Sequence, residues 1–129
     1  MMLKSLVACA LILAAVPAFA GDPKAGATVF KKCQACHAVG EDAKNKVGPE
    51  LNGLFERSAA SVPDYKYSQP MKDSGIVWTP EIFAEYIKNP RAMVPGTTMA
   101  FAGLKKDKEI EDITAYLAQF NADGTIKVE

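Results

Sequence analysis

Cys33-Gln34-Ala35-Cys36-His37 is the stretch of sequence that decides how this chain folds. It places two thiols next to an imidazole, at the spacing by which c-type haem is attached to proteins. In that chemistry the two sulfurs form thioethers with the porphyrin vinyl groups, and the adjacent histidine reaches the iron. His37 is the sole histidine of the chain. The motif therefore predicts one covalently bound haem c, with His37 as one axial ligand of the iron.

Residues 1–20 have the pattern of a secretory signal peptide. Lys4 supplies an early positive charge, residues 6–16 form an apolar run, and Ala18-Phe19-Ala20 is a small-x-small cleavage site. The run is shorter than the ~20 apolar residues that a membrane span needs. We predict cleavage after Ala20 and export to the periplasm, which leaves residues 21–129 as a single domain.

The composition of the exported chain narrows the class of protein. Loss of Lys4 leaves 14 basic and 15 acidic side chains, and the resulting net charge of −1 predicts no nucleic-acid partner. Cys9 ends a segment that resembles a lipoprotein processing box, but most of the apolar run follows that box, so lipidation is disfavoured. Cys33 and Cys36 are then the only cysteines left. The histidine directly after them favours haem attachment over the disulfide expected of an exported pair.

Three main helices are predicted from start signals and apolar spacing. Asp22-Pro23 begins the first, which carries Cys33 to the porphyrin edge. Thr79-Pro80-Glu81 begins the second, which ends before Pro90. Asp107 is expected to cap the third, whose apolar stripe is the clearest helical pattern in the chain. The stripe consists of Ile110, Ile113, Thr114, Leu117 and Phe120.

Short elements and long loops make up the remainder. A short helix is predicted over 69–73, residues 76–78 resemble a strand without a pairing partner, and residues 121–129 form a frayed polar tail. The intervening loops are too long for a self-sufficient core, whereas a large flat apolar cofactor would give them a surface to pack on. We therefore predict an all-α fold with three main helices, short helices and long loops around one haem.

The second axial ligand has three methionine candidates, Met71, Met93 and Met99, besides a lysine or an open site. A single methionine most often fills a core. Met99 is distinguished by its loop, residues 94–101, which contains Pro95-Gly96 and lies far along the chain from the histidine. A thioether suits low-spin haem iron and raises its reduction potential. With both axial positions filled, outer-sphere electron transfer is the chemistry that remains.

The sequence resembles the class I c-type cytochromes, the soluble cytochromes c of bacteria and mitochondria, over nearly all of residues 21–129. Beyond the haem-attachment motif, the segment Pro95-Gly96-Thr97-Thr98-Met99-Ala100-Phe101 makes the resemblance specific. Further motifs match at the same spacing: Val47-Gly48-Pro49, Asn52-Gly53-Leu54-Phe55, Arg57, Trp78, Tyr86, Asn89-Pro90 and Gly103-Leu104-Lys105-Lys106. The resemblance implies a single haem domain that carries electrons and is not an enzyme.

The resemblance implies a role for each matching residue around the iron. Cys33 and Cys36 would form the thioethers, and His37 and Met99 would be the two axial ligands. The carbonyl of Pro49 would accept the other imidazole N–H, which fixes the ring and makes it a better donor.

A second group of residues would support this centre. Tyr86 would hydrogen-bond the methionine sulfur, and Thr97 would support the same loop. Arg57, Tyr67 and Trp78 would point donors at a buried haem propionate, because a buried carboxylate without such partners costs several kcal/mol. For Trp78 and Tyr86 the alternative is ordinary core packing.

Basic residues recur around the haem-bearing segments, and the resemblance implies that they ring the exposed haem edge. The expected ring consists of Lys32, Lys46, Arg91, Lys105 and Lys106. It would steer a monomeric carrier onto acidic redox partners, such as a quinol-oxidising complex, a terminal oxidase, a reaction centre or a periplasmic dehydrogenase. The alternative for each residue is a simple solvated cation.

Two other classes of function are weighed against the electron carrier. A haem enzyme or gas sensor would have an open sixth site and usually a distal acid or base, for which no second histidine exists. A zinc site would need ligands beyond Cys33, Cys36 and His37. A thioredoxin-like dithiol protein would be colourless, whereas a haem protein is red. Met71 stands where mitochondrial relatives usually have asparagine, which puts their polar network near Met99 in doubt and adds a competing thioether.

Overall fold

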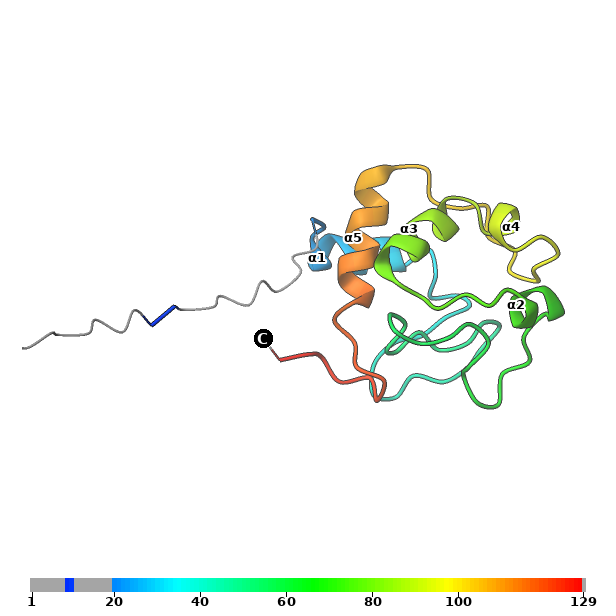
Figure 1. Ribbon diagram of the computed structural model, residues 1–129, viewed down its shortest axis with the longest axis horizontal. Helices are drawn as coiled ribbons and strands as arrows, with labels where there is room; N and C mark the ends of the chain where they lie inside the picture. The colour runs from blue at the N-terminus through cyan, green and yellow to red at the C-terminus, as the bar shows by residue number, and fades with distance from the viewer. Residues whose placement is uncertain (1–8, 11–19, 129) are drawn as a thin grey trace, which may run out of the picture.

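The computed structural model describes residues 9–10 and 20–128, so the predicted signal peptide lies almost entirely outside the described residues. Within the described part the chain forms helices and isolated bridges but no extended strand (Figure 1). The all-α prediction, with three longer helices and short ones between them, is confirmed. The helices are α1 (Pro23–Phe30), α2 (Gln69–Asp73), α3 (Pro80–Lys88), α4 (Pro90–Met93) and α5 (Asp107–Leu117). None of them is long and apolar enough to cross a membrane.

Two of the predicted helix starts are confirmed by their caps. The Asp22 carboxylate accepts from the Lys24 N–H at 2.9 Å at the start of α1. The Thr79 hydroxyl accepts from the Ile82 N–H at 3.1 Å at the start of α3. The prediction for α5 is wrong, because its N-cap is Lys106, which makes no side-chain cap bond. Asp107 is instead the first helical residue, where its charge complements the helix dipole.

Pro90 has two functions, of which the sequence pattern revealed only the first. It ends α3, as predicted, although the last helical residue is Lys88 rather than Asn89. It also occupies the first position of α4, a helix that was not predicted. The Asn89 side chain caps α4 by accepting from the Ala92 N–H at 3.3 Å. Proline suits this first position because the N–H that it lacks would have no partner in the helix.

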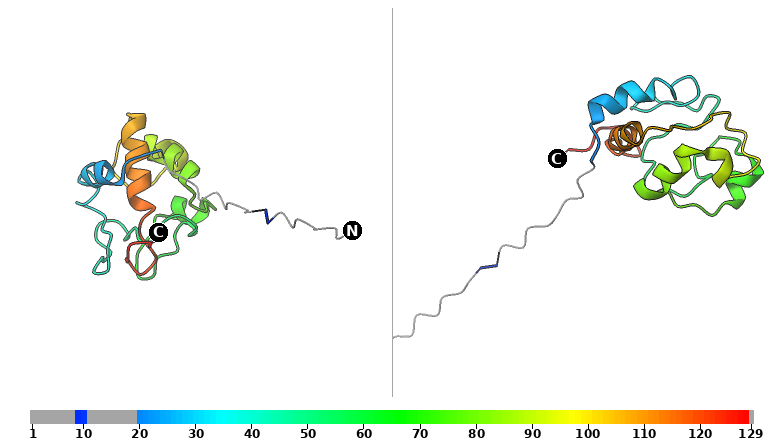
Figure 2. Two further views of the ribbon diagram at one scale, coloured as in Figure 1. Left: turned by 90° about the vertical axis from the view of Figure 1, so that its left-hand side faces the viewer. Right: turned by 90° about the horizontal axis from the view of Figure 1, so that it is seen from above.

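The helices α1 and α5 cross at a very close approach, which Figure 2 shows from two sides. A Cβ atom on Gly26 would lie 2.0 Å from the carbonyl oxygen of Asp112, so only glycine allows this packing. The rings of Phe30 and Tyr116 meet beside the crossing, with centroids 5.4 Å apart. The two ends of the domain are therefore joined by direct helix packing, and we call α1 and α5 the helix pair.

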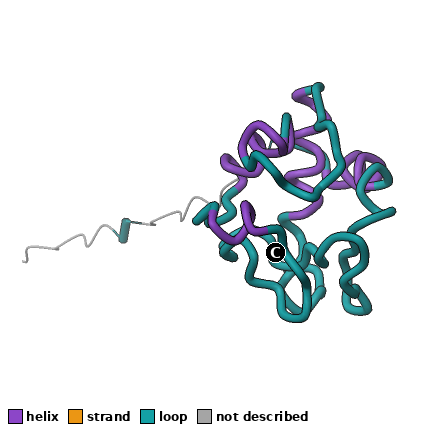
Figure 3. The backbone as a smooth tube through the Cα atoms, turned by 90° about the vertical axis from the view of Figure 1, so that its right-hand side faces the viewer, coloured by secondary structure: helices purple, strands orange, loops and turns teal. Residues whose placement is uncertain are grey.

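Residues 38–68 form no helix, and we call them the loop half. Figure 3 shows the helices gathered on one side of the molecule and loops forming the other. The prediction that residues 76–78 lack a pairing partner is wrong. The Trp78 N–H donates to the Arg57 carbonyl at 3.0 Å, next to a bridge between Ser58 and Val77. This pairing fastens the loop half to the segment that precedes α3.

Backbone contacts hold the C-terminal tail as far as Lys127, so the prediction of a frayed tail is wrong for residues 121–127. The Lys127 N–H donates to the Gln119 carbonyl at 2.8 Å, and Phe120 forms a bridge with Ile126. Gly124 is buried against the loop half, where a Cβ atom would meet the Gly40 carbonyl at 2.1 Å. Long-range backbone contacts, which no local pattern reveals, hold this polar segment in place.

Candidate functional site

A cavity of about 310 Å³ lies between the helices and the loop half. Its wall is mainly apolar and includes Leu54, Phe83 and Leu117. Every residue predicted for the haem site also lines it. These are Cys33, Cys36, His37, Pro49, Arg57, Tyr67, Trp78, Tyr86, Thr97 and Met99. The structure thus brings together residues that are spread over the whole domain.

A helical turn that continues from α1 presents the attachment motif to this cavity. The His37 N–H donates to the Cys33 carbonyl at 2.9 Å, and the Cys36 N–H donates to the same oxygen at 3.0 Å. Both cysteines are half-buried and form no disulfide. Backbone hydrogen bonds of this turn therefore fix the two sulfurs and the imidazole relative to one another.

The orientation of the His37 ring is set by Pro49. Nδ1 lies 2.7 Å from the Pro49 carbonyl oxygen. Because a carbonyl oxygen only accepts, Nδ1 carries the proton and Nε2 keeps its lone pair for a metal. Burial lowers the pKa of His37, the Pro49 bond opposes that shift, and the charges of Arg57 and Lys46 add to it. The neutral imidazole, which is the form that binds iron, is thus favoured.

Gly48 makes room for the His37 ring. A Cβ atom at this position would lie 2.4 Å from Cε1 of His37 and 2.7 Å from Nδ1. The Gly48 N–H donates to the Cys36 carbonyl at 2.8 Å, which holds the glycine against the motif. The sequence motif that contains this glycine gave it no role, because its place against the ring is visible only in three dimensions.

The thiol chemistry disfavours the zinc and dithiol alternatives. Burial, followed by the neighbouring Cys36, raises the pKa of the Cys33 thiol to about 11, with Lys32 opposing the shift. A thiol of this pKa is almost fully protonated at neutral pH, whereas dithiol exchange through Cys33 needs the thiolate. Among residues 9–10 and 20–128, no three His, Cys, Asp or Glu side chains gather to form a metal site.

Met99 lines the cavity from the loop after α4, and two neighbours hold it there. The Tyr86 hydroxyl of α3 donates to the Met99 sulfur at 3.1 Å, and the Thr97 hydroxyl accepts from the Met99 N–H at 3.2 Å. Burial raises the pKa of Tyr86 to about 12, so the phenol keeps its proton at neutral pH. Trp78 packs against Tyr86 with ring centroids 4.8 Å apart. The contacts expected of Tyr86 and Thr97 are both present.

The other two methionines differ in their position. Met71 lines the cavity from α2 and is partly buried. Met93, at the end of α4, is 38% exposed and is not part of the cavity wall. Tyr86 forms its hydrogen bond with Met99 rather than with Met71.

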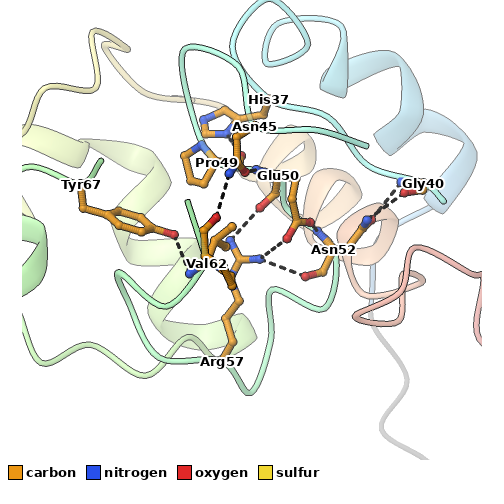
Figure 4. A network of polar contacts seen from close by, with 10 residues as sticks. His37, Gly40, Asn45, Pro49, Glu50, Asn52, Arg57, Val62 and Tyr67 are labelled. Atoms are coloured by element: carbon orange, nitrogen blue, oxygen red, sulfur yellow. Dashed lines mark hydrogen bonds and ion pairs between the residues drawn. The ribbon is translucent and has the colours of Figure 1, made fainter. Parts of the chain in front are cut away.

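Arg57 is held in the cavity wall by the chain that follows Pro49 (Figure 4). Its guanidinium donates to the Asn52 carbonyl at 3.0 Å and to the Glu50 carbonyl at 2.9 Å. Tyr67 lies on the neighbouring loop, where its hydroxyl accepts from the Val62 N–H at 3.0 Å. The structure thus places both predicted polar side chains at the cavity.

Several residues of the site had no predicted role. The Tyr65 hydroxyl donates to the Val47 carbonyl at 2.6 Å and joins two loops at the cavity. The Asn45 amide donates to the Pro63 carbonyl at 3.0 Å and joins the same loops. The one available signal was the spacing of Tyr65 and Tyr67, which pack together with ring centroids 4.8 Å apart.

The five basic residues of the expected ring are all exposed, but they have different surroundings. Lys32 lines the cavity and pairs with Glu109 at 2.9 Å. Lys46 donates to the Gln34 carbonyl at 2.7 Å, and Lys105 donates to the Lys88 carbonyl. Three of the five are therefore held to the protein surface by contacts of their own.

Comparison with known proteins identifies the family. The profile of the family described as Cytochrome c matches residues 23–121. The chain belongs to the cytochrome c family. It is 50% identical to cytochrome c2 of Blastochloris viridis over 127 residues, which covers 97% of this chain and 100% of that protein. It is also 55% identical to cytochrome c-550 of Nitrobacter winogradskyi over 109 residues, covering 84% of this chain and 100% of the relative.

Membership of the cytochrome c family agrees with the residues of the cavity. Haem c, the cofactor of this family, supplies an iron that alternates between the ferrous and ferric states when it is bound. The apolar wall, the paired cysteines, the oriented Nε2 of His37 and the tight fit of Gly48 all suit that group. The protein is an electron carrier and not an enzyme.

Proposed function

We propose that this cytochrome c carries electrons with an iron bound by His37 and Met99 and a haem attached through Cys33 and Cys36. The observation that carries the proposal is the pair of hydrogen bonds on the two candidate ligands, from Nδ1 of His37 to Pro49 and from Tyr86 to the Met99 sulfur. The first leaves Nε2 of His37 free for iron, and the second uses only one of the two lone pairs of the sulfur. The iron then changes charge without changing ligands, which keeps reorganisation small.

The absorption spectrum of the ferric protein tests this assignment. A thioether–iron charge-transfer band is expected in the wild type and is expected to disappear in Met99→Ala. Met71→Ala is the matched control inside the cavity and Met93→Ala the control outside it, and both should keep the band. Loss of the band in Met71→Ala with retention in Met99→Ala would contradict the assignment of Met99 as the ligand.

We also propose that the basic ring receives acidic redox partners, of which a quinol-oxidising complex, a terminal oxidase, a reaction centre and a periplasmic dehydrogenase are candidates. Lys32 lines the cavity, and Lys46 and Lys105 are held in place by backbone carbonyls, which supports a fixed docking surface. Association with an acidic oxidase should slow as salt rises, because exposed charges are screened. Lys32→Glu should slow it further, whereas Lys127→Glu on the C-terminal tail should not.

We propose, finally, that the chain is exported and cleaved between Ala20 and Gly21 and acts as a monomer. The Nitrobacter relative is matched in full over 109 residues, the same number that cleavage would leave. Gly21 packs closely on α5, where a Cβ atom would meet the Glu111 carbonyl at 2.0 Å. Native mass spectrometry of periplasmic protein should give one chain that begins at Gly21 and carries one haem. Another N-terminus or a dimer mass would contradict the proposal.

A further inference from the structure

Glu50 uses its two carboxylate oxygens for different contacts. Oε2 accepts from the Asn52 N–H at 2.7 Å, which fixes the turn of the chain after Pro49. Oε1 lies 3.6 Å from Nη1 of Arg57. The side chains of Glu50 and Arg57 are 21% and 17% exposed, so this ion pair is poorly screened by water and salt. Nothing in the sequence pattern singled out Glu50.

Arg57 is the charge that Glu50 offsets. Two backbone carbonyls fix its guanidinium in the cavity wall, and Figure 4 shows the pair among the loops that surround it. Burial lowers the pKa of Arg57 and Glu50 opposes that shift, but a guanidinium remains protonated at any working pH. The cavity therefore has a permanent positive charge in its wall and a carboxylate attached to it.

The field of Arg57 reaches the candidate iron ligand. Arg57 and His37 both line the cavity, so the guanidinium charge lies in the wall of the site that would hold the haem. A positive charge in the wall favours the ferrous state of a bound haem, because that state carries one positive charge less than the ferric state. A carboxylate that neutralises part of this charge acts in the opposite direction and lowers the reduction potential.

We infer that Glu50 is a positioning residue for Arg57 and that its charge, acting through Arg57, lowers the reduction potential of the bound haem. The inference rests on the proposed haem site. It distinguishes Glu50 from the exposed carboxylates of the loop half, which water screens. Glu56 is one such group, an exposed residue that precedes Arg57 in the chain and whose carboxylate forms no ion pair with another described residue.

The test compares Glu50→Gln with Glu56→Gln in the purified holoprotein by potentiometric titration. The glutamine oxygen at position 50 still accepts from the Asn52 N–H, so the turn is kept while the charge is lost. We expect Glu50→Gln to shift the reduction equilibrium about threefold towards the ferrous form, which is about 28 mV at 59 mV per tenfold change. This shift should persist at high salt. Glu56→Gln should give a smaller shift that high salt removes, and equal shifts in the two variants would overturn the inference.

A double-mutant cycle shows whether the effect passes through Arg57. Glu50→Gln, Arg57→Gln and the double variant should give non-additive shifts of the potential, because loss of the Glu50 carboxylate also changes how the Arg57 guanidinium is held and hence how strongly it acts on the haem. Additive shifts would overturn the coupling to Arg57. The ferric thioether band is recorded on every sample. Its absence from the wild type would count against the proposed ligands, whereas an intact band with an unshifted potential would count against the role of Glu50 alone.

Discussion

The helix pair and the loop half are held together in different ways. The helices α1 and α5 meet at Gly26, with Ile113 and Leu117 almost fully buried behind them. The loop half is held instead by polar contacts between distant residues, such as Asn52 with Gly40, at 2.8 and 2.9 Å. Several of its apolar side chains line the cavity. The helix pair also lines the cavity but has direct helix packing besides, so we expect the loop half to depend more strongly on the haem.

The largest expected effect comes from preventing haem attachment. In Cys33→Ala/Cys36→Ala the cavity of about 310 Å³ would be left without its occupant. Loss of the packing between the haem and its apolar wall should cost several kcal/mol, which is comparable to the whole stability of a small domain.

Hydrogen exchange measures this loss in each region. Amides of the loop half should lose nearly all protection, while those where α1 packs on α5 should keep some of it. Equal protection in the two regions would show that the loop half does not depend on the haem more than the helix pair does.

Gly26→Val tests how much the close packing of α1 on α5 contributes to stability. The valine side chain would be placed against the Asp112 carbonyl, where no room exists, and the helices would have to separate. We expect a loss of about 3 kcal/mol in the free energy of unfolding, measured by denaturant titration of the holoprotein.

Ala27→Val is the matched control for that variant, because Ala27 is exposed on the same helix. It should cost only about 0.5 kcal/mol through its lower helix propensity. A similar loss in both variants would mean that the close approach of α1 and α5 contributes little.

Gly48→Ala addresses the contact between the loop half and the attachment motif. The new methyl group would displace the His37 ring and lengthen its hydrogen bond to Pro49. A loss of about 2 kcal/mol in the free energy of unfolding is expected, together with a shift of the His37 ring N–H resonance in the ferrous protein.

Gly75→Ala is the control for Gly48→Ala, because it introduces backbone strain without a steric clash. Gly75 has a positive φ of 66°, but a Cβ atom added there would have no neighbour within 4 Å. The substitution should therefore cost about 1 kcal/mol from its backbone alone. The His37 resonance should not move in this control. Movement in both variants would show that the resonance does not report on the ring contact.

Tyr86→Phe has the smallest expected effect at neutral pH, about 1 kcal/mol, because it removes one hydrogen bond to the Met99 sulfur. Its pH dependence is more informative. Burial raises the pKa of Tyr86 from 10 to about 12, so this group costs the wild type stability as the pH rises through that window, a loss that the phenylalanine variant lacks. The variant should therefore become the more stable protein near pH 12. Parallel stability curves from pH 7 to 12 would contradict this.

The sequence predicted well those features that depend on interactions between neighbouring residues in the chain. The starts of α1 and α3 follow from a capping side chain and a proline in the next position. By contrast, the predicted cap at Asp107 was wrong, because the helix begins one residue earlier than expected, with Asp107 itself helical. The predicted frayed tail was wrong because Gly124 packs against Gly40, a contact between residues far apart in the sequence. Tyr65 was missed since its partner, Val47, is 18 positions away.

The sequence by itself determined that haem c is the cofactor, because thioether attachment needs only the side chains of one short motif. It also determined the main helices and singled out Met99 among three methionines as the expected second ligand. The resemblance already implied the hydrogen bond from Tyr86 to the Met99 sulfur, and the structure shows it. Only the tertiary structure decided that Gly48 receives the His37 ring and that Glu50 is attached to Arg57. These contacts join segments that approach one another only when the whole domain packs. A local sequence pattern does not show which of them will meet.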